Sequence, residues 1–232
     1  GSMTNLAGKR ILITGATGAL GSRIASALHE MGAQLVLTGR TVEGLQALQI
    51  PAELYAYDLN HPGAADALIP AVTAGGALDG MVIAHGVVAF GPASELDYAT
   101  LSTLTQLNHV GPMQLIHATL PALLEAKAAG SEPFVLTISG VIADMPTAGM
   151  AAYGAGKAGL KAFVQAAQRE VRREGIRLVD ARPPHTETGL ATRAISGQAP
   201  AMPAGLNPDA VAQRIVAGIV GDEKDLPVEV FS

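Results

Sequence analysis

Tyr153 and Lys157 lie four residues apart in AAYGAGKAGL, and Ser139 ends the apolar run FVLTIS fourteen residues before the tyrosine. On a helix, a spacing of four puts two side chains on one face, about one turn apart. A free tyrosine has a pKa near ~10, and a neighbouring ammonium favours its phenolate form. In a partly desolvated cleft, such a pair can donate or accept a proton near neutral pH. Taken alone, such a pair is usually only a surface tyrosine beside a lysine, so its setting in the chain decides between the two interpretations.

The elements that would hold these residues alternate between short apolar runs and longer helical patterns. This alternation predicts an α/β fold, a doubly wound, mostly parallel sheet of seven strands with helices on both faces. The 232 residues suit one domain, expected over 4–232, and the helical stretch 95–128 is expected to break near Gly111 and Pro112. Strands are expected at 10–14, 34–38, 53–57, 80–84, 134–139, 176–181 and 227–231, and helices at 19–31, 41–48, 62–74, 95–128, 151–174 and 207–220.

Composition narrows the range of functions. Apolar residues make up 49% of the chain and charged residues 15%, which is typical of strands buried on both sides. A net charge of −5, 3% aromatic residues and no tryptophan argue against nucleic-acid binding. Without cysteine there is no thiolate site, and no metal site is predicted. No apolar run reaches the ~18 residues of a membrane helix. Residues 1–3 resemble a tag remnant, no signal peptide follows, and we expect a cytoplasmic protein.

A glycine-rich segment, TGATGALG, follows the first expected strand and precedes an amphipathic helix. Glycines in this position let the backbone approach a pyrophosphate, whose charge the helix N-terminus stabilises. An ordinary strand–helix turn is the alternative, and the pattern is not G-x-G-x-x-G. The segment predicts a dinucleotide site formed by Thr14, Gly15, Thr17, Gly18, Ala19, Leu20 and Gly21.

The end of the second expected strand bears on which cofactor binds. It reads Thr38, Gly39 and Arg40, with no acidic residue to bind a ribose 2′-hydroxyl. The Arg40 guanidinium suits a 2′-phosphate instead, so NADP(H) is favoured and NAD(H) is the alternative. After the third expected strand, Asp58 is placed to accept a hydrogen bond from the adenine amino group, and Leu59 follows it. The other interpretation of Asp58 is an aspartate that caps a turn.

In this order, TGATGALG, Asn108, Ser139, Tyr153 and Lys157 resemble the short-chain dehydrogenase/reductase family over nearly all of residues 8–231. The resemblance implies a Rossmann-type fold and an oxidoreductase that interconverts a carbonyl and an alcohol with a nicotinamide cofactor. It implies that Tyr153 is the general acid or base, and that Lys157 lowers its pKa and holds the nicotinamide ribose. Ser139 would polarise the substrate oxygen. Asn108 would hold a water in a proton relay with the lysine.

The chain departs from the family pattern in three places. The first turn reads T-G-x-x-G-x-x-G, which is more usual in the extended subgroup, whereas the 75 residues after Lys157 suit only the compact, single-domain subgroup. The family's N-N-A-G reads I-A-H-G, so that His85 is either a buried histidine or a cofactor contact. The family's P-G reads P-P after the sixth expected strand. In these two places, the residues expected at the cofactor are Ala84, His85, Gly86, Pro183, Thr186 and Thr188.

A long irregular segment follows the sixth expected strand. Loops of this length inside a compact domain are often functional, and we expect a substrate flap at about 185–205. The flap and the segments 87–93 and 140–149 contain mostly small and apolar residues, with Arg193 as the exception. A neutral, largely apolar carbonyl or alcohol is therefore the expected substrate. The family resemblance implies a homodimer or homotetramer formed through the helices at 95–128 and 151–174.

Three functions remain open at the level of sequence. The catalytic set together with Arg40 favours an NADP(H)-dependent oxidoreductase. The position of Gly18 suggests, as an alternative, an epimerase or dehydratase of the same family that retains its cofactor. The departures at 83–84 and at Pro184 suggest a non-catalytic, cofactor-binding regulator.

Overall fold

A six-stranded parallel sheet lies at the centre of the computed structural model, which describes residues 3–232. Gly1 and Ser2, two of the three residues expected to be a tag remnant, lie outside the described residues. The strand order is β3-β2-β1-β4-β5-β6, and each neighbouring pair is parallel, so the carboxyl ends of all strands lie along one edge. The strands are β1 (Arg10–Thr14), β2 (Gln34–Gly39), β3 (Ala52–Ala56), β4 (Gly80–Ile83), β5 (Phe134–Ile138) and β6 (Arg177–Ala181).

The prediction of a seventh strand at 227–231 is wrong. Residues Val228–Phe231 form a short 3-10 helix instead. The chain pairs with β6 at one point, where the Leu226 N–H donates to the Asp180 carbonyl and the Leu226 carbonyl accepts from the Arg182 N–H. The next rung of a parallel ladder would need an N–H from Pro184 to the Val228 carbonyl, and Pro184 has none, so the pairing stops although the sequence at 227–231 alternates like a strand.

Helices connect the strands. The helical stretch 95–128 is expected to break near Gly111 and Pro112, and what the structure has there is a local change of helix type. Helix α4 continues into α5 through a π-helical turn, η1 (Gln106–Val110), in which the Gly111 N–H donates to the Gln106 carbonyl. Pro112 lies in the first turn of α5, where its missing N–H costs no hydrogen bond. Within residues 3–232, no helix combines the length and apolarity needed to span a bilayer. The helices are α1 (Ala19–Glu30), α2 (Val42–Gln46), α3 (Ala64–Ala74), α4 (Tyr98–Thr105), α5 (Gly111–Ala128), α6 (Ala151–Val171) and α7 (Pro208–Val220).

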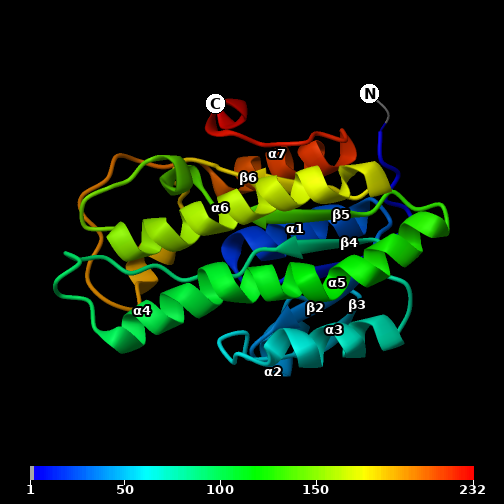
Figure 1. The fold of residues 1–232 in the computed structure, drawn as a ribbon, viewed down its shortest axis with the longest axis horizontal. Coiled ribbons are helices and arrows are strands. Elements are labelled where there is room, and N and C mark those ends of the chain that lie inside the picture. The colour runs from blue at the N-terminus through cyan, green and yellow to red at the C-terminus, as the bar shows by residue number, and fades with distance from the viewer. Residues whose placement is uncertain (1–2) are drawn as a thin grey trace.

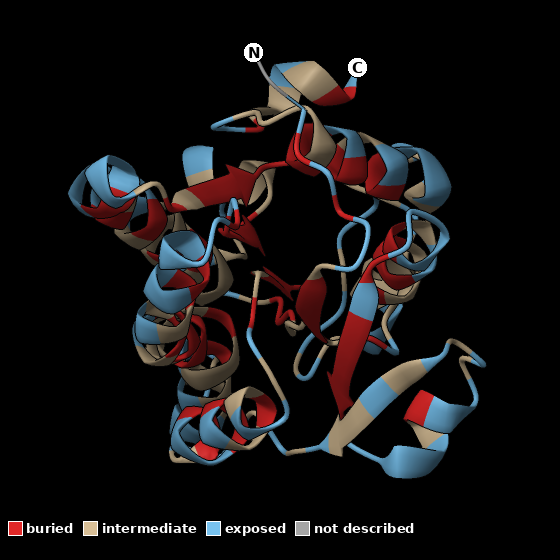
Figure 2. Ribbon diagram, turned by 90° about the vertical axis from the view of Figure 1, so that its right-hand side faces the viewer, coloured by how far each residue is buried: buried red, intermediate tan, exposed pale blue. Residues whose placement is uncertain are grey.

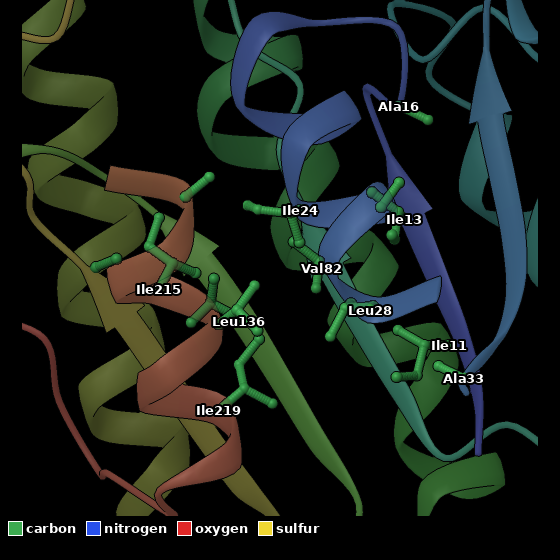
Figure 3. Close-up of a cluster of buried hydrophobic side chains, with 14 of the residues drawn as sticks. Ile11, Ile13, Ala16, Ile24, Leu28, Ala33, Val82, Leu136, Ile215 and Ile219 are labelled. Atoms are coloured by element: carbon green, nitrogen blue, oxygen red, sulfur yellow. The ribbon is translucent and has the colours of Figure 1, made fainter. Parts of the chain in front are cut away.

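Two apolar cores hold the helices against the two faces of the sheet, which confirms the predicted doubly wound α/β fold (Figure 1). Helices α1 and α7 cover one face, where Ile24 and Ile215 lie over strand residues such as Ile13 (Figure 3). Helices α3, α5 and α6 cover the other face. Buried positions follow the sheet and the inner sides of the helices, while the outer sides are exposed (Figure 2). This packing fixes α6 against the end of β5.

The turn after β1 is compact because its glycines lie against other backbone atoms. Gly15 has a φ of 61°, and a Cβ at this position would lie 2.5 Å from the backbone N of His85. A Cβ at Gly21 would lie 2.1 Å from the Gly15 carbonyl oxygen, whereas one at Gly18 would lie 3.2 Å from the same atom. Gly15 and Gly21 are therefore required for the shape of the turn, and Gly18 is less constrained.

Candidate active site

The structure brings Ser139, Tyr153 and Lys157 together at the carboxyl end of β5. Ser139 directly follows the strand, and Tyr153 and Lys157 lie in the first two turns of α6. The Lys157 Nζ donates to the Ile138 carbonyl oxygen at 3.1 Å and lies 5.9 Å from the centre of the Tyr153 ring. Lys157 is only 8% exposed, so its ammonium is held within the protein beside the residue that precedes Ser139.

Burial changes the proton affinity of the two groups in opposite senses. It raises the pKa of Tyr153 to about 12, so the phenol is neutral and can donate a hydrogen bond at pH 7. Burial lowers the pKa of Lys157 to about 8, and the nearby negative charge of Asp180 limits that decrease. In this structure the lysine therefore titrates closer to neutrality than the tyrosine does, which differs from the phenolate suggested by their spacing.

Asn108 belongs to the same cluster through the π-helical turn. It is buried, its Oδ1 accepts from the Val87 N–H at 3.0 Å, and its Nδ2 donates to the Val87 carbonyl at 2.7 Å. A Cβ at Gly86 would lie 3.1 Å from this Oδ1 and 3.4 Å from the Lys157 Nζ. Asn108 therefore holds the segment after β4 beside the lysine, and the absence of a side chain at Gly86 allows the close approach.

The residues expected at the pyrophosphate form the turn between β1 and α1. Helix α1 begins after Gly18 without a side-chain cap, so the N–H groups of its first turn are available to an anion. The end of β2 lies beside this turn, because a Cβ at Gly39 would lie 3.5 Å from the Thr17 methyl group. Arg40, the next residue, is exposed. The expected site residues of this turn and of β2 thus lie in one place.

His85 closes the turn from the side of β4. Its Nδ1 lies 2.7 Å from the Thr14 Oγ1, which also accepts from the Ala84 N–H at 3.2 Å. The Nε2 atom is buried and has no hydrogen-bond partner among the described residues. Burial and the charge of Lys157 lower the pKa of His85 to about 4, so the ring is neutral at pH 7. His85 is thus a half-buried residue with an enclosed Nε2 and a backbone that abuts Gly15, and the role expected at the cofactor stays a prediction.

Two other expected contacts occupy local turns. The Asp58 Oδ1 accepts from the Asn60 N–H at 3.0 Å, as expected for an aspartate that caps a turn. Asp58 is exposed after the end of β3, and Leu59, which follows it, is half-buried. The Thr186 Oγ1 donates to the Pro184 carbonyl at 2.9 Å, and the Thr188 Oγ1 accepts from the Leu190 N–H at 3.3 Å. The hydroxyls of both threonines therefore take part in the shape of their own loop.

The expected flap lies over the segment after β4, at the carboxyl edge of the sheet (Figure 1, orange). The Ile195 N–H donates to the Val88 carbonyl at 2.9 Å, and the Phe90 N–H donates to the Ser196 carbonyl at 2.9 Å. Near the base of the flap, the Pro183 carbonyl accepts from the Val141 N–H at 3.0 Å. These bonds join three segments that are far apart in the sequence around Ser139, Tyr153 and Lys157, the expected catalytic residues.

Sequence reasoning missed two buried charges next to Ser139. Asp180 and Arg182 are 1% and 3% exposed, and Asp180 accepts a hydrogen bond from the Ser139 hydroxyl. The Arg182 Nη1 lies 3.0 Å from the Asp180 Oδ2 and 2.9 Å from the Asp225 Oδ1. The signal available in the sequence was a pair of charges, D-A-R, at the end of an apolar strand, where charged residues are rarely buried unless paired.

Comparison with known sequences decides the family. The model of the family described as short chain dehydrogenase matches residues 9–199. The chain belongs to the short-chain dehydrogenase/reductase family. The chain is 28% identical to an uncharacterized oxidoreductase of Staphylococcus epidermidis over 193 residues, which cover 81% of this chain and 82% of that protein. It is also 28% identical to the sulfoacetaldehyde reductase of Chromohalobacter salexigens over 186 residues, which cover 77% and 72%.

A solved structure has the same fold. The chain superimposes on a metagenomic short-chain oxidoreductase in complex with NADP with a TM-score of 0.80 and 29% identity, over 97% of this chain and 98% of the other. The family match and these relatives make the chain an oxidoreductase that acts between alcohols and carbonyls with a nicotinamide cofactor.

Replacing Lys157 by methionine should stabilise the folded protein at pH 7. The pKa of Lys157 is lowered from 10.5 to about 8, and a change of this size corresponds to about 3 kcal/mol against the charged form. Allowing for the lost hydrogen bond to Ile138, we expect Lys157→Met to raise the free energy of unfolding in urea by about 1–3 kcal/mol.

The pH dependence of this difference distinguishes the cause. Between pH 8 and 10.5 the unfolded chain binds more protons than the folded one at this site, so wild-type stability rises with pH and the advantage of Lys157→Met shrinks. Lys161→Met is the matched control, because Lys161 is 25% exposed and paired with Asp144. A Lys157→Met protein that is no more stable than wild type at pH 7 would contradict the assignment of a costly buried charge.

Proposed function

We propose that this chain is an NADP(H)-dependent oxidoreductase that interconverts a small neutral carbonyl and its alcohol, with Tyr153 as the proton donor or acceptor. The observation that supports it is the cluster of Ser139, Tyr153 and Lys157 at the carboxyl edge of the sheet, beside the glycine-rich turn. In open parallel sheets, ligands bind at this edge where the strand order reverses, here between β1 and β4.

The residues of the turn fit a dinucleotide. Gly15 and Gly21 leave no room for a side chain, and the first N–H groups of α1 are open to a pyrophosphate. When bound, the nicotinamide supplies or accepts the hydride. The buried Lys157 ammonium, 5.9 Å from the Tyr153 ring, favours charge that develops on the phenol as its proton moves to the substrate oxygen. Asn108 and Gly86 keep the backbone beside this ammonium.

Arg40 supports NADP(H) as the cofactor. It is exposed at the end of β2, beside Thr17 of the turn, and carries a guanidinium suited to a 2′-phosphate. The structurally similar metagenomic oxidoreductase is in complex with NADP. Asp58, Leu59, Pro183, Thr186 and Thr188 remain proposed contacts of the rest of the cofactor.

Substrate and assembly follow from the surroundings of the cluster. We infer that the flap at about 185–205, bonded to Val88 and Phe90, forms one wall of a mainly apolar pocket that selects a neutral substrate. We also propose a homodimer or homotetramer formed through α4, α5 and α6. Tyr98 on α4 is 90% exposed and Leu124 on α5 is 38% exposed, which supports an apolar contact there.

Removing the Tyr153 hydroxyl should abolish most of the turnover. On a carbonyl found by screening small ketones and aldehydes with NADPH, we expect Tyr153→Phe to lower kcat by roughly 10²–10⁴-fold, the usual contribution of a positioned acid. NADPH affinity, measured by fluorescence titration, should be unchanged. Tyr98→Phe is the matched control, because Tyr98 is almost fully exposed. Turnover by Tyr153→Phe within twofold of wild type would rule out this role.

Removing the Arg40 guanidinium should weaken NADPH binding selectively. A hydrogen bond to a charged group contributes about 1.5–3 kcal/mol, so Arg40→Ala should raise the Kd for NADPH roughly 10–100-fold. The Kd for NADH should stay within about twofold because NADH has no 2′-phosphate. The control is Arg173→Ala, an exposed arginine beyond the far end of α6. An unchanged ratio of the two dissociation constants in Arg40→Ala would remove the argument for NADP(H).

A further inference from the structure

Asp180 is a carboxylate buried directly beneath the proposed catalytic serine. The register of β5 and β6 pairs Thr137 with Asp180, so both side chains and that of Ser139 lie on the face of the sheet that α6 covers. Asp180 Oδ1 accepts from the Thr137 Oγ1 at 2.7 Å, and its Oδ2 accepts from the Ser139 Oγ and from the Arg182 Nη1. All three contacting groups can donate, which is the hydrogen-bonding pattern that an ionised carboxylate requires.

The charges around Asp180 balance one another. Arg182 also contacts two further carboxylates, Asp225 and Asp144, with its Nε 3.1 Å from an Asp144 oxygen. Lys161 forms an ion pair with Asp144, and the positive charge of Lys157 acts on Asp180. Burial raises the pKa of the Asp180 carboxyl, while its hydrogen bonds and Arg182 act in the opposite direction. Three carboxylates thus face three cations, which is the condition under which charges are tolerated in an interior.

The contact with Asp180 determines how Ser139 can meet a substrate. A serine hydroxyl has one hydrogen to donate, and an ionised carboxylate can only accept. A substrate oxygen that approaches Ser139 therefore meets the lone pairs of its Oγ. This arrangement is the reverse of a serine that donates a hydrogen bond to a carbonyl.

An alcohol fits this arrangement better than a carbonyl does. Its hydroxyl can donate to the Ser139 Oγ and accept from the Tyr153 phenol, whereas a carbonyl oxygen can only accept. We propose that Asp180 is a positioning residue that takes the Ser139 hydrogen, so that the site binds the alcohol in preference to the matching carbonyl. The inference rests on the proposed function, in which Ser139 and Tyr153 face the substrate oxygen. According to this inference, the enzyme binds the alcohol more tightly than the carbonyl of the same substrate pair.

Two substitutions at Asp180 separate hydrogen-bond direction from charge. The KM for an alcohol with NADP⁺ and the KM for its carbonyl with NADPH are measured for a substrate pair found by the activity screen. Asp180→Ala removes the acceptor and frees the Ser139 hydrogen, so we expect the ratio of alcohol KM to carbonyl KM to rise about tenfold. Asp180→Asn keeps an oxygen that accepts from Ser139 and Arg182, so its ratio should stay within about twofold of wild type.

Controls identify which claim fails. Asp225→Asn alters a different carboxylate that binds Arg182 and does not contact Ser139, and it should leave the ratio of alcohol KM to carbonyl KM unchanged. In a Ser139→Ala background, Asp180→Ala should have no further effect on the ratio. Equal shifts in Asp180→Ala and Asp180→Asn, or no shift in either, would overturn the inference. If Ser139→Ala itself leaves turnover and both KM values unchanged, the proposed role of Ser139 fails instead.

A measurement on the wild-type enzyme covers the case in which Asp180→Ala does not fold. Unreactive ternary complexes are formed with the alcohol on NADPH-loaded enzyme and with the carbonyl on NADP⁺-loaded enzyme, and each dissociation constant is determined. The alcohol should bind about tenfold more tightly, as expected for one matched rather than mismatched hydrogen bond. Equal affinities, or tighter binding of the carbonyl, would overturn the inference.

Discussion

The parallel register of β5 with β6 is the constraint on which the site depends. It pairs Thr137 with Asp180 and lets the Ser139 N–H donate to the Ala181 carbonyl, so the serine is fixed by its backbone before its side chain acts. The chain then returns as α6, whose Lys157 donates to the Ile138 carbonyl at 3.1 Å. A shift of the register by one residue would turn Asp180 to the opposite face of the sheet and remove the partner of Ser139.

This framework places charges where an ordinary core would have apolar side chains. Lys157, Asp180 and Arg182 are all nearly buried, between the sheet and α6. Each is paired with an opposite charge or a carbonyl, since an isolated buried charge would cost several kcal/mol. The lowered pKa of Lys157 and the raised pKa of Tyr153 are consequences of the same burial. The apolar cores on both faces of the sheet hold the strands and the helix that carry these charges.

Sequence alone predicted the parts of the molecule that follow from local pattern. Apolar runs and glycine spacing located six strands, the turn at Thr14–Gly21 and the positions of Ser139, Tyr153 and Lys157. The pattern failed where a missing backbone donor ends a ladder, as at Pro184, beyond which the chain after Leu226 no longer pairs with β6. It could not reveal the Asp180–Arg182 network, because Asp144 and Asp225 come from distant segments and meet Arg182 only in the folded chain.

The central claim is that a hydride is exchanged between the nicotinamide and a substrate carbon. Transfer of deuterium from the cofactor tests this claim most directly. NADPH deuterated at both C4 positions is incubated with the enzyme and a carbonyl found by screening, and the product is examined by mass spectrometry and NMR. Deuterium on the former carbonyl carbon, with one NADP⁺ formed per alcohol, is the predicted result. Conversion of substrate with the label retained in the cofactor, or with solvent hydrogen at that carbon, would contradict it and indicate an epimerase or dehydratase.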